Sequence, residues 1–353
     1  MLAVGKYSEL IIDEPDELGD FEDCPKLCAL STSKLPEPTS HLYNQLGHLS
    51  FFGNPRTDLV EALRSSPSLK SLKFGNIHDG LAKTRSHDNI TSHDNLTSLH
   101  MLGGFSDMMF SSFNFPSLRN LVVDGEYDWP TNAFPSFISR SSCMITTFTL
   151  RGVSLSDLDL IAVLQVMPAL LHLEVDKLHR SGEHQSPITS HLLSSLTRDP
   201  STSISLVPRL HSLHLTCICE STDVNNDGSD DGSDEGSNDE FNDGSEDESN
   251  DGSDNESNDG SDNGSDNGSD NGSGSEFDDE FDDAAFIRMV QSRWFKPGSD
   301  LAAEMSALGK SSIRSVVLNF TQREVDADIY KPLQILDAEG LRVVVSGTNG
   351  VQV

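Results

Sequence analysis

Hydrophobic residues recur along this chain in one short frame. The frame reads Leu-x-x-Leu-x-Leu, with other aliphatic residues or Phe at the same places, as in Leu69-Lys-Ser-Leu72-Lys-Phe74 and Leu210-His-Ser-Leu213-His-Leu215. The second Leu and the residue two positions later point to the same side of a short strand. A single strand of this kind cannot bury its own apolar side, so the pattern predicts several copies stacked in a parallel sheet.

The spacing of the frames is that of a repeat protein. They begin at residues 7, 27, 46, 69, 96, 118, 145, 170, 210, 313 and 341. Most intervals are 19 to 28 residues, close to the repeat length of leucine-rich-repeat proteins. We therefore predict the α/β class: a leucine-rich-repeat-like solenoid of parallel strands with helical or irregular returns.

The residues between frames carry helix signals. Polar capping residues open apolar stretches, and proline or glycine follows them. The segments predicted to be helical are 59–63, 158–167, 187–196 and 284–295, the last opened by Asp282 and Asp283. Each ends shortly before the next frame, as a strand–helix repeat requires.

The long interval between the frames at 210 and 313 contains an acidic tract. Residues 221–283 hold 25 Asp and Glu and no Lys or Arg, so they carry −25 of the formal net charge of −33. Removing these 63 residues from the 103-residue interval leaves 40, which equals the interval before it. A segment so polar cannot bury an apolar core. We predict a solenoid at 1–220, a disordered acidic insert at 221–283, and the solenoid continuation with a C-terminal cap at 284–353.

Charge and hydropathy argue against several partners and compartments. A nucleic-acid-binding protein needs a positively charged surface to contact the phosphates. The net charge of this chain is negative, which argues against such a surface. No stretch approaches ~18 uninterrupted apolar residues, and Met1–Leu10 lacks the pattern of a signal peptide. We expect no nucleic-acid or membrane partner and a cytoplasmic or nuclear location. The spacing of the five cysteines is not that of a zinc site, and we expect no metal or other cofactor.

The sequence contains no recognisable catalytic motif, so we expect a non-catalytic protein. Polar residues lie between the frame leucines and should face outward on the concave side of the solenoid. The candidate partner-binding residues are Lys70, Lys73, His100, Arg119, Asn120, His172, Glu174, His211 and His214. Several of them are histidines, which in a cluster suggest acid–base or metal chemistry; ordinary polar surface is the alternative reading.

Several segments resemble a known family. The segments are Phe134-Pro-Ser-Phe, Leu155-Ser-Asp-Leu, Met167-Pro-Ala-Leu-Leu-His-Leu-Glu-Val175, Phe286-Ile-Arg-Met-Val and Gly340-Leu-Arg-Val-Val-Val345. They are similar to the leucine-rich-repeat region of F-box proteins from mushroom-forming (basidiomycete) fungi. The resemblance covers residues 40–220 and 284–353. It implies a repeat domain that captures a protein partner or a ubiquitination substrate.

The F-box motif of these family members is not recognisable in this sequence. Family members place it before the repeats, where it docks on a Skp–cullin scaffold. Here only Leu35-Pro36-Glu37 is similar, and Pro38 breaks the helix that should follow. Docking to that scaffold is thus expected only if an F-box lies upstream.

The acidic insert supports a second hypothesis, in which it attracts basic partners such as histone-like or ribosomal proteins. We select four of its serines, each with an acidic residue three positions downstream, which is the pattern that an acidophilic kinase recognises. These phosphorylation candidates are Ser237, Ser245, Ser253 and Ser275.

Overall fold

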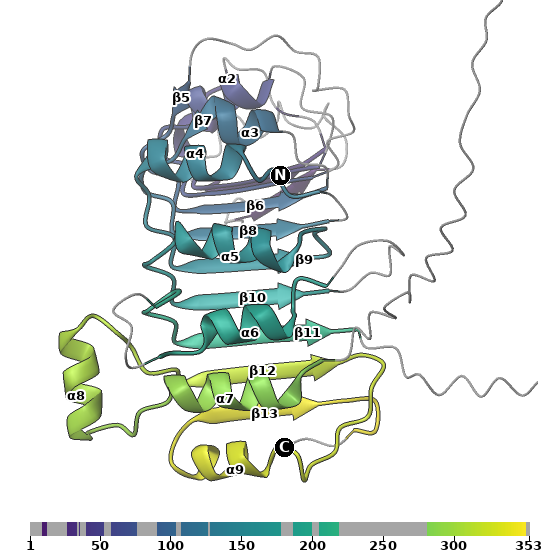
Figure 1. Ribbon diagram of the computed structural model, residues 1–353. Coiled ribbons are helices and arrows are strands. Elements are labelled where there is room, and N and C mark those ends of the chain that lie inside the picture. Colours follow the sequence, from purple (N-terminus) through teal and green to yellow (C-terminus); the bar gives the residue numbers. More distant parts are fainter. Residues whose placement is uncertain are drawn as a thin grey trace, which may run out of the picture. The chain divides into compact units, whose positions relative to one another are not determined.

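The computed structural model describes residues 9–12, 27–33, 35, 40–52, 58–75, 90–103, 107–125, 128–177, 186–199, 205–218 and 281–350. Within them, eleven strands form one parallel sheet in which the strands follow chain order (Figure 1). They are β1 (Glu9–Ile12), β2 (Ala29–Thr32), β3 (His48–Phe52), β4 (Ser71–Gly75), β6 (Ser98–Leu102), β8 (Asn120–Asp124), β9 (Thr147–Arg151), β10 (His172–Asp176), β11 (Ser212–Cys217), β12 (Ser315–Phe320) and β13 (Arg342–Ser346). Strands β5 (Thr91–Ser92) and β7 (Phe113–Asn114) pair separately. The predicted parallel repeat fold is confirmed.

Ten of these strands begin two residues after a predicted frame, and the frame leucines of neighbouring repeats pair in register. Leu72, for example, is aligned with Leu49 on one side and with Leu99 on the other, and all three are buried. From β2 to β13, the pleat sends the second and fourth residues of each strand of the main sheet into the core. The apolar pattern alone thus fixes which side of the sheet is buried.

The frame placed at Leu341 was wrong by one residue. In β13, Val343 and Val345 align with Val316 and Leu318 of β12, so this repeat begins at Gly340. Gly340 has φ +107°, a conformation that residues with side chains rarely adopt. A glycine therefore stands where most other repeats carry leucine, and the pattern was displaced onto Leu341.

A repeated pair of backbone hydrogen bonds joins the N-terminal ends of neighbouring strands. The amides of Lys70 and Ser71 both donate to the carbonyl of Gly47, at 2.8 and 3.0 Å. Across the predicted insertion, the amides of Arg314 and Ser315 donate to the carbonyl of His211 in the same way, at 2.7 and 3.1 Å. The other carbonyls that accept such a pair belong to Cys28, Lys70, Thr97, Arg119, Thr146 and Leu171.

Helices return the chain between strands, and α4 to α7 cover one face of the sheet (Figure 1). The helices are α1 (Leu42–Gln45), α2 (Asp58–Ser65), α3 (Asp107–Ser112), α4 (Ala133–Ser141), α5 (Asp157–Gln165), α6 (Ser190–Leu196), α7 (Asp283–Arg293), α8 (Asp300–Ala307) and α9 (Lys331–Ala338). Four of them, α2, α5, α6 and α7, match the predicted helices. Helix α6 begins three residues later than predicted because Thr189 caps it, accepting a hydrogen bond from the amide of Leu192.

The last three residues of the predicted insert belong to the repeat domain. Phe281 is buried against Phe286 and Phe320. Asp282 caps α7 through the amide of Ala285, and Asp283 bonds to side chains of the C-terminal repeats. The boundary predicted at 283 is therefore corrected to before Phe281, because an aromatic side chain between acids still enters the core. Residues 221–280 lie outside the described residues.

A buried arginine connects the chain on either side of the predicted insert. Arg293 of α7 is fully buried, and its guanidinium donates to the carbonyl oxygens of Leu196, Leu206 (2.6 Å) and Val207 (3.1 Å). Burial lowers the pKa of Arg293, yet a guanidinium stays protonated in proteins. These carbonyls therefore solvate a buried positive charge.

Candidate functional site

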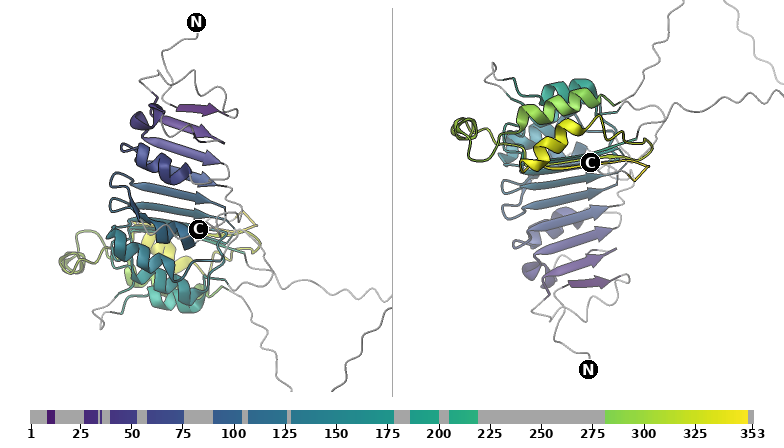
Figure 2. Two further views of the ribbon diagram at one scale, coloured as in Figure 1. Left: turned by 90° about the horizontal axis from the view of Figure 1, so that it is seen from above. Right: turned by 90° about the horizontal axis from the view of Figure 1, so that it is seen from below.

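The face of the sheet opposite α4 to α7 carries a continuous band of polar side chains. They stand at the third and fifth positions of the strands, which point away from the core. We call this band the polar strip; it consists of Lys73, His100, Asp124, Arg151, Glu174, Asp176, His214, Asn319 and Ser346. It crosses eight consecutive strands of the main sheet, β4 to β13. Figure 2 shows these strands side by side from two further directions.

Arg151 lies at the centre of the strip and forms its strongest ion pair. Its Nε and Nη2 donate to Oε1 of Glu174 at 3.1 and 2.7 Å, and its Nη1 lies 3.9 Å from Oδ2 of Asp124. The hydrogen bond to Glu174 raises the pKa of Arg151. For Asp176, burial outweighs the nearby Arg151 and raises the pKa of the carboxyl group. The central strip thus presents charges that are fixed in position and partly removed from water.

A chain of hydrogen bonds continues the strip toward the last strand. Ser346 donates from Oγ to Oδ1 of Asn319 at 2.6 Å, and Nδ2 of Asn319 lies 2.9 Å from Nε2 of His214. An amide nitrogen can only donate, so Nε2 of His214 is the acceptor and its proton is assigned to Nδ1. The two ends of the strip therefore differ: Lys73 and His100 lie at one end, and uncharged hydrogen-bonding groups at the other.

The sequence-predicted residues fall into two rows on this face. Lys73, His100, Glu174 and His214 belong to the strip. Those at the N-terminal edge of the sheet, in the first position of a strand or the residue before it, are Lys70, Arg119, Asn120, His172 and His211. All nine are exposed or half-buried. The four phosphorylation candidates, Ser237, Ser245, Ser253 and Ser275, lie outside the described residues.

Sequence reasoning missed Asp124, Arg151, Asp176, Asn319 and Ser346. Each stands six residues after the start of its frame, which is the first position after the Leu-x-x-Leu-x-Leu motif. From β3 to β13, the strands of the main sheet continue at least one residue past the last frame position, and in the strands that carry these residues the first one past it points outward again. Extending the frame by one residue would have revealed these side chains.

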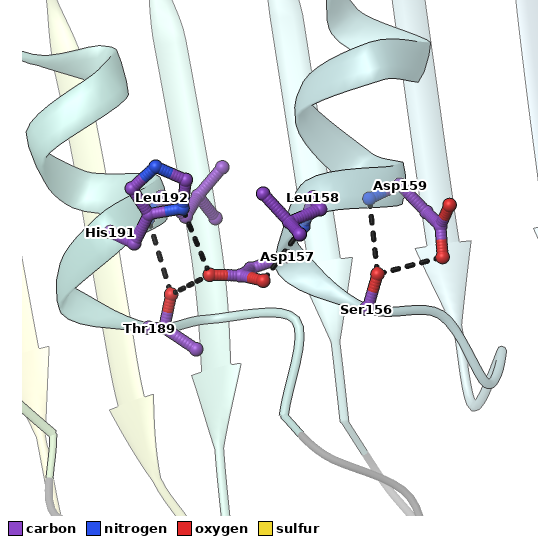
Figure 3. Close-up of polar contacts among 7 residues, drawn as sticks. All are labelled: Ser156, Asp157, Leu158, Asp159, Thr189, His191 and Leu192. Carbon is purple, nitrogen blue, oxygen red and sulfur yellow. Dashed lines mark hydrogen bonds and ion pairs between the residues drawn. The ribbon is translucent and has the colours of Figure 1, made fainter.

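A second polar cluster lies between the N-termini of α5 and α6 (Figure 3). Oδ2 of Asp157 accepts from Thr189 Oγ1 at 2.6 Å and lies 3.2 Å from His191 Nδ1. Burial alone would raise the pKa of Asp157, but hydrogen bonds from Thr189, Leu158 and His191 outweigh it and lower the pKa.

An aspartate bonded to a histidine beside two hydroxyls has the composition of a hydrolase triad, but both hydroxyls are already committed. Thr189 Oγ1 accepts from the amide of Leu192, and Ser156 Oγ from that of Asp159. They cap α6 and α5. We assign the cluster a structural role, in which it links neighbouring repeats.

Among the described residues, no group of three or more His, Cys, Asp or Glu side chains is placed to hold a metal ion. In the same part of the chain, no helix is both long and apolar enough to cross a membrane. No protein-family model matches the chain, and no curated protein is significantly similar to it.

Proposed function

We propose that this protein is a non-catalytic interaction module that binds a protein partner through the polar strip. The fold supports this class of function, since stacked repeats present an extended surface whose side chains are held by the sheet. The observation that carries the proposal is the Asp124–Arg151–Glu174 ion pairing at the centre of the strip. It positions charges of both signs on a face that α4 to α7 leave open.

The size of the strip suits an extended peptide or a protein surface. Neighbouring strands lie about 4.8 Å apart, so eight strands span about 34 Å. A fully extended segment of about ten residues has that length. The strip mixes three carboxylates with a lysine, an arginine and two histidines, so a partner of mixed charge is favoured over a polyanion.

Charge reversal on opposite faces tests the proposal. The full chain is used to capture partners from cells that express it, beside Arg151→Glu and the control Arg288→Glu. Arg288 is exposed on α7, so the control changes the net charge equally on the helix-covered face. We expect the captured proteins to fall at least tenfold with Arg151→Glu and to be retained with the control. Equal capture by all three chains would refute the strip as the binding surface.

A ubiquitination substrate is the more specific partner that the resemblance to F-box proteins supports. In that case the strip would select the substrate, and an upstream F-box would supply the Skp–cullin scaffold. Co-purification of the Skp adaptor with the protein expressed from its own gene locus would support this role. Its absence from complexes that still contain the strip-dependent partner would contradict it.

The acidic insert supports a second function, the attraction of basic proteins by residues 221–280 with their 23 carboxylates. Phosphorylation at the four candidate serines would add about −1.5 to −2 charge each. Salt separates the two functions. Binding to a polyanion should collapse as the Debye length falls from about 10 Å at 0.1 M to 3 Å at 1 M, whereas binding to a shaped strip should weaken far less.

A further inference from the structure

Helix α8 is a second helix within one return of the solenoid, between α7 and β12. Figure 1 and Figure 2 both show it beside the sheet, beyond the ends where the strands begin. The segments that lead into and out of it are joined at their base. The amide of Phe295 donates to Oγ of Ser312 at 2.9 Å, and this hydroxyl lies 3.2 Å from the carbonyl oxygen of Phe295. Residues 296–311 therefore form an excursion that is closed at its base.

The apolar side of α8 faces solvent. None of the α8 residues is buried, whereas every other described helix buries at least one side chain. Leu301 is 47% exposed and Leu308, at the C-cap, is 62% exposed. Met305 lies between them on the same side, because positions i, i+4 and i+7 of a helix share a face. We call these three residues the α8 stripe; their spacing is that of a coiled-coil seam.

Local signals explain why α8 forms without burial. Oγ of Ser299 accepts from the amide of Ala302 at 3.2 Å and caps the N-terminus. At the other end Gly309 has φ +70°, and the amide of Lys310 donates to the carbonyl of Met305 at 2.9 Å, as in a Schellman motif. Helices this short are still marginal in water and normally gain stability when an apolar face packs. A capped helix with an uncovered stripe therefore favours a docking partner.

The charged residues of α8 lie along one flank of the stripe. Leu301 and Leu308 occupy d positions of a heptad and Met305 the a position between them, which places Glu304 at g. Asp300, four residues before Glu304, lies on the same side of the helix. Both carboxylates are exposed, and α8 contains no lysine or arginine. A partner that covers the stripe thus meets negative charge along one edge.

This charge discriminates among possible occupants. A second copy packed antiparallel would place its Glu304 opposite Glu304 of the first, and two chains of net charge −33 repel each other. The chain's own acidic residues 221–280 would also meet like charge. A helix with apolar a and d positions and a basic flank instead gains an ion pair, since residues at e and g select the partner of a helix pair.

We propose that the α8 stripe docks an amphipathic helix of a partner protein, whose apolar seam covers Leu301, Met305 and Leu308 and whose lysine or arginine pairs with Glu304. The stripe supplies the affinity, and Glu304 selects the basic flank. Helix α8 is separate from the polar strip, so either surface can fail without the other.

The test is fluorescence anisotropy of the full chain with a fluorescein-labelled synthetic peptide. The peptide carries leucine at a and d and lysine at e and g over about four heptads, and the lysines keep it from pairing with itself. A second peptide has the same composition in scrambled order and measures diffuse attraction to the acidic residues. We expect the patterned peptide to bind at least tenfold more tightly. Equal binding of the two peptides would overturn the proposal.

A pair of matched variants locates the binding. Leu308→Ser and the control Leu158→Ser, on α5, remove leucines of nearly equal exposure, 62% and 65%. Because neither side chain is buried, both variants should unfold at the temperature of the wild type. We expect Leu308→Ser to weaken binding of the patterned peptide about tenfold and Leu158→Ser to leave it within twofold. Equal effects of the two variants would overturn the α8 stripe as the docking surface.

Charge exchange tests the role of Glu304. Glu304→Lys should weaken binding of the lysine peptide and strengthen binding of a version with glutamate at e and g. The control Glu61→Lys makes the same change of charge at an exposed position of α2 and should change neither affinity more than twofold. If both variants act alike, the flank does not select the partner and the proposal is overturned.

Sedimentation equilibrium of the full chain reports on the rival occupant, a second copy. A monomer supports a stripe that is open to a partner. A dimer that is lost in Leu308→Ser but kept in Leu158→Ser would mean that a second copy covers the stripe, and would overturn the partner helix.

Discussion

Arg293→Met should destabilise the protein by removing one of the connections between α7 and the chain before the predicted insert. Methionine keeps most of the length and apolar volume of the arginine stem, so the main loss is the guanidinium. That group donates to the carbonyls of Leu196, Leu206 and Val207. Because Arg293 is fully buried, water cannot readily replace these donors.

The magnitude follows from two opposing effects. Hydrogen bonds that involve a charged group contribute about 1.5–3 kcal/mol each, so three amount to at most about 5–9 kcal/mol. Removing a buried positive charge returns several kcal/mol of desolvation energy. We expect a net loss of about 2–4 kcal/mol, a large part of the 5–15 kcal/mol that typically stabilises a domain.

Urea unfolding followed by circular dichroism measures this loss. The control is Arg209→Met, which removes the same charge from an exposed position and should change stability by less than about 0.5 kcal/mol. The reasoning is refuted if Arg293→Met is as stable as wild type. The carbonyls would then be satisfied without the guanidinium, and the connection across the insert would rest on the sheet and on Arg198, whose amide donates to Ser292 Oγ and whose guanidinium donates to the carbonyl of Ser311.

Three further predictions test the register, the capping cluster and the insert. Leu173→Asp places an unpaired charge among buried side chains and should cost about 5 kcal/mol or more, whereas His172→Asp, on the exposed side of the same strand, should change thermal stability little; equal damage would contradict the register. Since the pKa of Asp157 is lowered on folding, its contribution is present above the unfolded pKa of about 3.9 and lost as pH falls through the folded value. Asp157→Asn should therefore destabilise most above pH 4 and converge with wild type at lower pH in parallel urea titrations. Deletion of residues 221–280 should leave a single cooperative thermal transition, and a broadened or split transition would show that the insert supports the repeats.

Much of the fold could be predicted from sequence because each repeat buries the same face. The frame at Leu210 gave a strand at Ser212–Cys217 without knowledge of any other part of the chain. The frame at Leu341 failed for a local reason, since Gly340 meets a backbone requirement at the place where leucine normally marks the repeat. A hydrophobic pattern does not reveal a position where glycine is required by the backbone φ angle.

The candidate site was only half predictable. Glu174 was found because it lies between frame residues, but its partner Arg151 belongs to the preceding strand and lies outside the frame text. A cavity between α8 and the N-terminal ends of β11 and β12 was missed altogether. Its aromatic wall comes from Trp294 and Phe295, whereas its basic wall comes from His211 and Arg314. Their proximity depends on how the returns close, which no periodicity encodes.

The paired backbone hydrogen bonds at the N-terminal ends of the strands join neighbouring repeats without the use of side chains. The contact between repeats there uses amide and carbonyl groups, which every residue except proline can supply in full. The residues whose carbonyls accept these pairs are correspondingly diverse: Cys28, Gly47, Lys70, Thr97, Arg119, Thr146, Leu171 and His211. Mutation at these positions can change the chemistry of the surface while the scaffold stays intact. Natural variation can thus change the polar groups at this edge with little effect on the backbone contacts between repeats.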